Sequence, residues 1–224
     1  MRTVAVLPAY DEADTIGPVI EGARAHVEEV VVVDDGSSDG TADRAREHGA
    51  TVIEHVFNTG VGGAVRTGYR YAIEHGYEYV LQIDADGQHD PDAIPRLLSA
   101  ADDADMVIAS RYRNGSFAEY SPVRRAGIRF FTWVVNALGG VDVTDVTSGF
   151  RVYRVEALES ILHRSDDHWA VEQTLDAARR DQRIVEVSVA MPTRATGESQ
   201  FTIDTFVRYP FRMADVVLRV LLFR

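Results

Sequence analysis

The stretch Val30-Val-Val-Val-Asp-Asp-Gly-Ser-Ser-Asp-Gly-Thr41 decides the fold class of this chain. Four consecutive valines are typical of a strand that is buried on both faces of a parallel sheet. The Gly and Asp residues that follow predict a turn and then a capped helix that ends at about residue 48. Because neighbouring strand residues point to opposite faces, only one of Asp34 and Asp35 is expected to face a cleft.

The same alternation of apolar strand and amphipathic helix continues on both sides of this stretch. It predicts strands over residues 3–8, 51–55, 79–84 and 105–110, with helices over 14–27, 60–75 and 91–101. Beyond residue 110 we expect helices over 123–138, 155–162 and 168–180, and strands over 147–153 and 183–191. Short strands that alternate with helices of about 10–15 residues predict an α/β fold, with a mostly parallel sheet and helices on both faces.

The composition excludes several classes of protein. The 224 residues include no Cys, so the chain has no disulfide and no thiolate metal site. The net charge is −12 and all 23 basic residues are Arg. An acidic first half argues against nucleic-acid binding, which needs a basic face, whereas the Arg-rich second half could receive an anion. Strong acidity without Lys fits either a halophilic source or a codon bias.

The chain shows no sign of a membrane-spanning helix, because no window approaches about 18 uninterrupted apolar residues. It starts directly in an apparent strand, without the apolar run of a signal peptide, so we expect a cytoplasmic protein. The last segment, residues 201–224, mixes Phe, Val and Leu with Arg and predicts an amphipathic helix. This helix could lie at a membrane interface, or it could dock on the domain.

Polar residues follow the predicted strands where they end, and parallel sheets bind ligands at that edge. The segments are Pro8-Ala-Tyr-Asp-Glu12, Asp34-Asp35, Asp84-Ala-Asp-Gly-Gln88 and Ser110-Arg-Tyr112. In an extended segment, Asp84, Asp86 and Gln88 would point to one side. Their oxygen atoms are ligands for Mg²⁺ or Mn²⁺, and such an ion can neutralise a departing diphosphate. The alternative is a solvated turn whose Asp residues cap a helix.

Several motifs in fixed order resemble the family 2 glycosyltransferases of GT-A fold, and within them the polyprenyl-phosphate branch of the dolichyl-phosphate mannose synthases. The motifs are Leu7-Pro-Ala-Tyr-Asp-Glu12, Val32-Val-Asp-Asp-Gly-Ser-Ser-Asp-Gly-Thr41, Asn58-Thr-Gly-Val-Gly-Gly-Ala64, Ile83-Asp-Ala-Asp-Gly-Gln-His89, Ser110-Arg-Tyr112, Arg124-Arg125 and Thr147-Ser-Gly-Phe-Arg151. The resemblance implies a domain over residues 1–200, with a nucleotide-binding half at 1–110 and an acceptor half at 111–200.

The resemblance also implies a role for each matching position. The nucleoside would be held at the first two strand ends, by Pro8, Tyr10, Glu12, Val33 and Asp35. The diphosphate would lie at Asp84, Ala85 and Asp86, with Asp84, Asp86 and Gln88 around a Mg²⁺ or Mn²⁺ ion. Arg111 would face the reacting phosphates and act in catalysis with Asp84 and Asp86. Arg194 matches a loop that closes over the donor.

The kind of acceptor depends on one physical difference. A sugar or protein hydroxyl needs a general base, whereas a lipid phosphate arrives ionised and needs Arg groups to position it. Candidates for the acceptor phosphate are Arg111, Arg124, Arg125 and Arg129, the last three beside an aromatic run that begins at Phe130. The alternative for these three is a solvated basic face on a core helix.

Two residues leave undecided whether the acceptor is a phosphate or a hydroxyl. The branch often has a hydroxyl at the position of Ile128, which weakens the match at the acceptor phosphate. Glu172 could serve as the base of a hydroxyl-acceptor enzyme, although its place in a predicted helix favours a helix-surface or structural role.

We therefore expect an inverting, metal-dependent transfer of a mannose- or glucose-type sugar. The donor would be a GDP- or UDP-sugar, and the acceptor a polyprenyl (dolichyl-type) phosphate at the inner face of the cell membrane. The alternatives are a family 2 enzyme with a hydroxyl acceptor and a non-catalytic module that binds a sugar nucleotide. A dinucleotide-dependent enzyme is disfavoured, because the segment that starts at Gly60 lacks the third glycine of the fingerprint.

Overall fold

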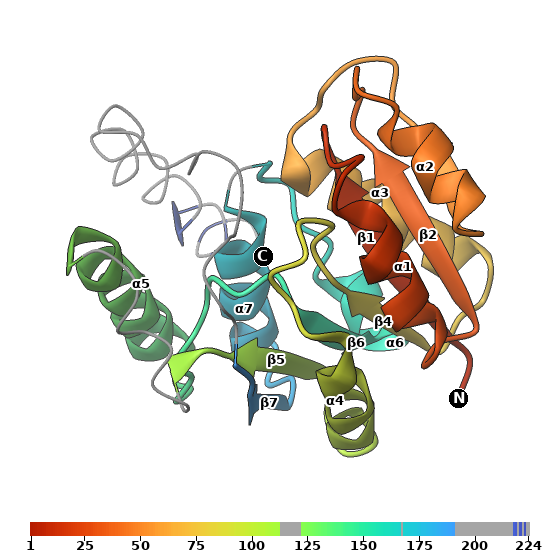
Figure 1. The fold of residues 1–224 in the computed structure, drawn as a ribbon. Helices are drawn as coiled ribbons and strands as arrows, with labels where there is room; N and C mark the ends of the chain where they lie inside the picture. The colour runs from red at the N-terminus through yellow and green to blue at the C-terminus, as the bar shows by residue number, and fades with distance from the viewer. Residues whose placement is uncertain (113–121, 167, 191–216, 219, 221, 223–224) are drawn as a thin grey trace.

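The computed structural model describes residues 1–112, 122–166, 168–190, 217, 218, 220 and 222. In this part of the chain, seven strands form one sheet in the order β3-β2-β1-β4-β6-β5-β7 (Figure 1). The strands are β1 (Thr3–Ala9), β2 (Glu29–Asp34), β3 (Thr51–Glu54), β4 (Tyr79–Gln82), β5 (Met106–Ser110), β6 (Arg151–Arg154) and β7 (Ile184–Ser188). The helices are α1 (Ile16–Arg24), α2 (Thr41–Glu47), α3 (Val61–Glu74), the 3₁₀ turn η1 (Pro91–Ala93), α4 (Ile94–Ala101), α5 (Pro122–Gly139), α6 (Val155–Ser160) and α7 (Trp169–Arg179).

The valines of β2 are buried on both faces of the sheet. Val30 and Val32 pack into one hydrophobic cluster together with α1, α2 and α4. Val31 and Val33 pack into a second cluster, on the opposite face, together with α3, α6 and α7. The predicted α/β fold, a mostly parallel sheet with helices on both faces, is confirmed.

Strand β6 is the antiparallel member of the described sheet. It lies between β4 and β5 and pairs antiparallel with both, whereas β1–β2, β1–β4, β2–β3 and β5–β7 are parallel pairs. Arg151, the first residue of β6, pairs with Gln82 at the end of β4 and with Ile108 near the end of β5. The segment that leads into β6 therefore meets the carboxyl ends of both neighbouring strands.

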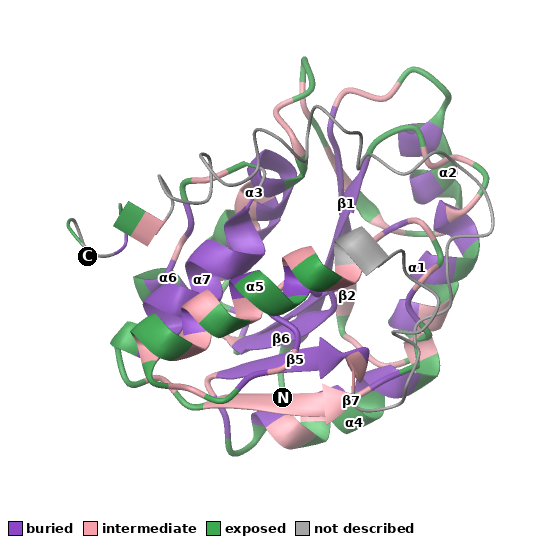
Figure 2. Cartoon of the chain, turned by 90° about the vertical axis from the view of Figure 1, so that its left-hand side faces the viewer, coloured by how far each residue is buried: buried purple, intermediate pink, exposed green. Residues whose placement is uncertain are grey.

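Helix α5 lies outside these two helical layers, against α7 (Figure 2). Phe131 and Val135 of α5 pack with Val171 and Leu175 of α7 in a third hydrophobic cluster. Val220, from the C-terminal segment, is fully buried in the same cluster. The side chain of Val220 thus packs on the domain, and the two alternatives for residues 201–224 stay predictions. Among the described residues, no helix has the length and apolar character needed to cross a membrane.

Two of the predicted strands that are shorter than expected border the candidate site. The strand predicted over 79–84 ends at Gln82, and the strand predicted over 147–153 begins at Arg151. Asp84 to Gln88 is thus a turn, with Gly87 at φ +73°, and the expectation that its side chains alternate as in a strand is wrong. The predicted domain boundary at residue 200 lies outside the described residues.

Candidate active site

The turn after β4 lies against the segment that leads into β6. A Cβ atom on Gly149 would lie 2.7 Å from Oδ2 of Asp84, so any larger residue would push that carboxylate out of its present position. The backbone N–H of Asp84 donates to Nδ1 of His89 over 3.2 Å, and the His89 ring stacks on Phe150 at a centroid distance of 5.0 Å. The antiparallel insertion of β6 therefore forms one wall of the candidate site.

The acidic turn itself is closed by a local hydrogen bond. The backbone N–H of Gln88 donates to Oδ1 of Asp86 over 3.0 Å. Burial lowers the pKa of His89 to about 4, against the opposing effect of the Asp86 charge, and the Arg111 charge lowers it further. His89 is therefore neutral at pH 7, which leaves Nδ1 able to accept the Asp84 N–H.

The side chains of this turn fit a divalent cation that is completed by substrate. Asp84, Asp86 and Gln88 offer two carboxylates and an amide oxygen, which are hard oxygen ligands. The described residues contain no cluster of three or more His, Asp or Glu side chains that could hold an ion alone. Two carboxylates and one amide oxygen suit Mg²⁺ or Mn²⁺, because such ions are commonly bound by one or two carboxylates plus phosphate oxygens and water.

Arg111, at the end of β5, forms a buried ion pair that the sequence reasoning missed. Its Nε lies 2.6 Å from Oδ2 of Asp145, and its Nη2 lies 2.7 Å from Oδ1. Nη2 also donates to Oγ1 of Thr147 over 2.7 Å. Burial alone would raise the pKa of Asp145, but the hydrogen bonds and charge of Arg111 outweigh it and hold that pKa below its ordinary value. The pair fixes the direction of the guanidinium.

The first two strand ends, predicted to hold a nucleoside, lie side by side. Pro8 of β1 is paired in register with Val33 of β2, and both are buried. Tyr10 follows β1 and is 46% exposed, so its ring is available to a ligand. The backbone N–H of Glu12 donates to Oγ1 of Thr41 over 2.8 Å, which joins the two loops. The structure therefore brings these predicted residues together at one edge of the sheet.

Asp35, also predicted at the nucleoside, is only 3% exposed and already accepts several hydrogen bonds. Its Oδ1 accepts from N and Oγ1 of Thr59, and its Oδ2 accepts from the N–H of Gly60. His55 Nδ1 lies 2.6 Å from the same Oδ1. Asp35 thus anchors the loop between β3 and α3, and a contact of Asp35 with the base stays a prediction.

The glycine-rich start of α3 is packed against the chain itself. The N–H of Gly62 donates to the carbonyl oxygen of Asp166 over 2.9 Å, and a Cβ on Gly62 would lie 2.6 Å from that oxygen. Glu172, the candidate base for a hydroxyl acceptor, is 2% exposed. Its carboxylate accepts the backbone N–H groups of Arg164 and Ser165, over 3.0 and 2.8 Å. Glu172 therefore holds the loop that covers the start of α3.

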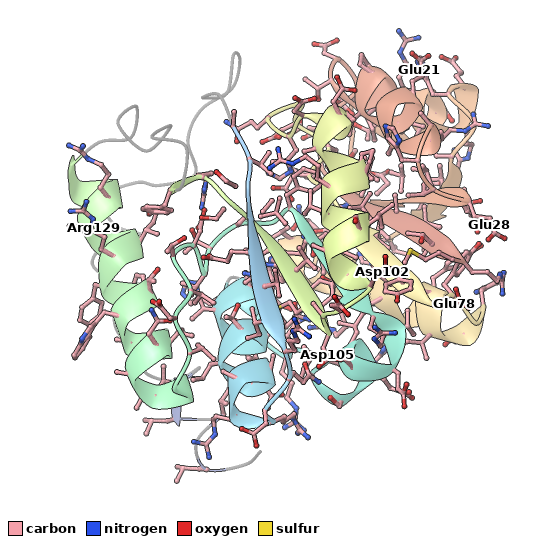
Figure 3. All side chains as sticks on the ribbon, turned by 90° about the horizontal axis from the view of Figure 1, so that it is seen from below. Glu21, Glu28, Glu78, Asp102, Asp105 and Arg129 are labelled. Atoms are coloured by element: carbon pink, nitrogen blue, oxygen red, sulfur yellow. The ribbon has the colours of Figure 1, made fainter. Side chains whose placement is uncertain are left out.

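The residues predicted for the acceptor phosphate lie on or near α5. Arg125 is half-buried and Arg129 is exposed, at the edge of the molecule (Figure 3). An open hollow of about 330 Å³ adjoins Arg129; its lining residues are Tyr112, Arg129, Thr132, Trp133, Asn136, Ala137 and Thr144. Ile128 is 6% exposed and packs against Tyr112, an apolar contact in place of the expected hydroxyl. Arg194 and the side chain of Arg124 lie outside the described residues.

An acidic turn suited to a cation, a buried Arg and the two loops predicted to hold a nucleoside lie at the carboxyl edge of a mostly parallel sheet. This arrangement is typical of an α/β protein that binds its ligand at this edge of the sheet. The family model described as "Glycosyl transferase family 2" matches residues 4–162. The chain belongs to this family and is a glycosyltransferase, as the motifs predicted.

Two relatives and one solved structure illustrate the similarity. An undecaprenyl-phosphate mannosyltransferase of Micrococcus luteus is 34% identical, over 90% of this chain and 88% of the relative. A polyprenol monophosphomannose synthase of Mycolicibacterium smegmatis is 32% identical, over 97% of this chain and 88% of the relative. The fold resembles glucosyl-3-phosphoglycerate synthase of Mycobacterium tuberculosis, solved with Mn²⁺, UDP and phosphoglyceric acid, with a TM-score of 0.73 at 22% identity over 98% of this chain and 78% of that one.

Proposed function

We propose that the chain transfers a mannose- or glucose-type sugar from a GDP- or UDP-sugar to a polyprenyl phosphate, with inversion at the anomeric carbon. An oxygen of the acceptor phosphate attacks the anomeric carbon in line, and the bond to the donor diphosphate breaks. The names of the two relatives, both enzymes of polyprenyl phosphates, support the acceptor class. The Mn²⁺ and UDP in the structural neighbour support a divalent cation and a nucleotide donor.

The residues of the acidic turn and of the first two strand ends would bind the donor. Asp84, Asp86 and Gln88 would hold Mg²⁺ or Mn²⁺, which would stabilise the charge that develops on the leaving diphosphate. The Arg111 guanidinium, held by Asp145, would lie beside the reacting phosphates without having to reorganise during the reaction. The ring of Tyr10 would lie beside the base of the nucleotide.

Helix α5 is the observation that carries the acceptor assignment. In a chain of net charge −12, the segment Pro122–Gly139 contains three Arg and no acid. Phe130 and Trp133 on the same helix are 54% and 65% exposed. A phosphate that carries an apolar chain needs cationic groups beside apolar surface, and an exposed Trp side chain favours the membrane–water interface. This chemistry supports a peripheral position at a membrane surface, which we propose to be the inner face of the cell membrane.

A hydroxyl acceptor is the second candidate, and it requires a base at the reacting oxygen. Glu172, the residue considered for this role, is buried and accepts two backbone N–H groups. A carboxylate that serves as a loop anchor is poorly placed to take a proton from a sugar. This observation favours the phosphate acceptor, which needs no base.

An extraction assay tests the proposal. Purified protein is incubated with radiolabelled GDP-mannose, UDP-glucose or UDP-N-acetylglucosamine, with Mg²⁺ or Mn²⁺, at low and at high salt. Polyprenyl phosphate is the acceptor and the uncharged polyprenol is the matched control. We expect label in the organic phase with the phosphate alone. Label that moves only to a soluble sugar acceptor would favour the hydroxyl alternative, and metal-dependent nucleotide binding without any transfer would favour the non-catalytic module.

A further inference from the structure

Arg151, the first residue of β6, is a buried cation without a carboxylate partner among the described residues. It is 0% exposed and is the largest of the fully buried side chains. Each of the ion pairs found in the described part of the chain involves other residues. A buried charge without a counterion is unfavourable unless its hydrogen bonds are satisfied, so its position in the core needs a structural reason.

The hydrogen bonds of Arg151 join two separate parts of the chain. Nε donates to the carbonyl oxygen of Ser148 over 2.7 Å, and Nη2 donates to that of Val146 over 2.8 Å. Nη1 donates to the carbonyl oxygen of Ala170 over 3.1 Å and to Oγ1 of Thr174 over 3.0 Å, both in α7. The guanidinium therefore ties the segment 145–149 to the first turns of α7.

The segment 145–149 in turn contacts two predicted catalytic side chains. Asp145 and Thr147 accept hydrogen bonds from the Arg111 guanidinium. Gly149 lies against the Asp84 carboxylate, with 2.7 Å between its ideal Cβ position and Oδ2. A shift of this segment would therefore move Arg111 and Asp84 relative to each other.

We propose that Arg151 is a positioning residue that fixes segment 145–149 on α7, and thereby sets the placement of Arg111 against Asp84. A planar guanidinium offers five N–H donors in fixed directions, which suits several acceptors at once. Lysine has one ammonium on a flexible chain and cannot reach both carbonyls and the helix in the same way. The inference rests on the proposed function, because it assigns the geometry a role in sugar transfer.

The test compares Arg151→Met, Arg151→Lys and Thr174→Val with the wild type. Arg154→Met is the matched control, since Arg154 lies at the other end of β6 and contacts Asp105 and the carbonyl oxygens of Ala101 and Asp102. Two quantities are measured: amide hydrogen exchange of peptides that cover segment 145–149, and kcat and KM for the donor sugar nucleotide. The milder variant Thr174→Val removes one anchor on α7 and serves if both Arg151 variants fail to fold.

We expect Arg151→Met and Arg151→Lys to speed exchange in this segment by about tenfold, with remote peptides unchanged. We expect kcat to fall by about 100-fold while KM stays within about threefold, because a misplacement of about 1 Å can cost that much in rate. Thr174→Val should give a smaller change of the same kind, and Arg154→Met should give neither. A global loss of stability would instead speed exchange everywhere.

The inference would be overturned if both Arg151 variants showed the hydrogen exchange and the kcat of the wild type. If neither variant folds, the same result in Thr174→Val would overturn it. The failure of the proposed function gives a different result, namely a wild-type protein that transfers no sugar. In that case the exchange data still decide whether Arg151 fixes the segment, since they do not depend on turnover.

Discussion

The buried pair of Arg111 and Asp145 makes a quantitative prediction for Asp145→Asn. The substitution keeps the shape of the side chain but removes its charge. Arg111 therefore loses one of the two Asp145 oxygen acceptors and keeps one neutral amide oxygen. Asp145 is 0% exposed and Arg111 is 8% exposed, so water cannot replace the lost interaction. Breaking one partner of such a pair costs about 3–5 kcal/mol, and we expect a loss near 3 kcal/mol because the amide retains one acceptor.

The assay is urea unfolding followed by circular dichroism, with identical high salt in all samples because the chain is strongly acidic. With a slope of about 2–3 kcal/mol per molar urea, a loss of about 3 kcal/mol lowers the midpoint by about 1 M. Asp142→Asn is the matched control, since Asp142 is exposed, and we expect it to change the free energy of unfolding by less than about 0.5 kcal/mol.

A double-mutant cycle with Arg111→Met separates the pair from the individual side chains. The single variants each leave a buried charge or acceptor without its partner, whereas the double variant removes both. We expect a coupling free energy of about 2 kcal/mol or more between the two substitutions. A loss below about 1 kcal/mol for Asp145→Asn, or strict additivity in the cycle, would refute the assignment of this pair as a strong buried interaction.

Four further predictions follow from the site. The folded-state pKa of Asp145 is lowered, so the contribution of its charge to the free energy of unfolding is present above about pH 3.9 and is lost as the pH falls through the folded pKa. Acid titration should therefore destabilise the wild type more than it destabilises Asp145→Asn. Asp86→Ala should reduce transfer by about 10²–10³-fold in the extraction assay with little change in melting temperature, because Asp86 is not in the core; normal turnover would remove its role. Gly149→Ala should lower kcat by about 100-fold, since its Cβ would displace the Asp84 carboxylate; an unchanged rate would show that Asp84 can move freely. Glu172→Gln should lower the free energy of unfolding by about 1–3 kcal/mol and leave the pH–rate profile unchanged; a lost basic limb in that profile would restore Glu172 as a base.

The sequence predicted the layers of the fold because its strongest signals are local. Alternate burial of Val30 to Val33 on the two faces follows directly from the period of a strand, and the helices were identified from their apolar periodicity and flanking glycines. The edge at which the polar loops gather follows from the parallel order of the first strands. These features need no knowledge of which distant residues meet.

The partners of the buried polar groups could not be predicted in this way. Asp145 and Arg151 act through contacts with Arg111 and α7 that exist only because β6 enters the sheet between β4 and β5. The place of an antiparallel strand in a sheet depends on long-range pairing, which hydrophobic periodicity does not report. The available signal was the segment Asp145-Val-Thr-Ser-Gly-Phe-Arg151, in which polar residues and a glycine interrupt a segment that otherwise resembles a strand.

Asp35 shows a second limit of motif reasoning. The doubled Asp after four valines correctly indicated a special position at the sheet edge, but not which groups the carboxylate would bind. In the structure its oxygens accept from the loop at Thr59 and Gly60. The motif therefore indicated the end of a strand at the sheet edge, whereas the contacts of an individual side chain required the fold.

The central claim is that the turn from Asp84 to Gln88 binds a divalent cation together with the donor diphosphate. A crystal structure with Mn²⁺ and a GDP- or UDP-sugar, with anomalous data at the manganese edge, measures this directly. We predict one anomalous peak in bonding contact with Asp86 and with the diphosphate oxygens, and Arg111 still held by Asp145. A nucleotide bound elsewhere, or manganese that contacts neither Asp84, Asp86 nor Gln88, would contradict the account.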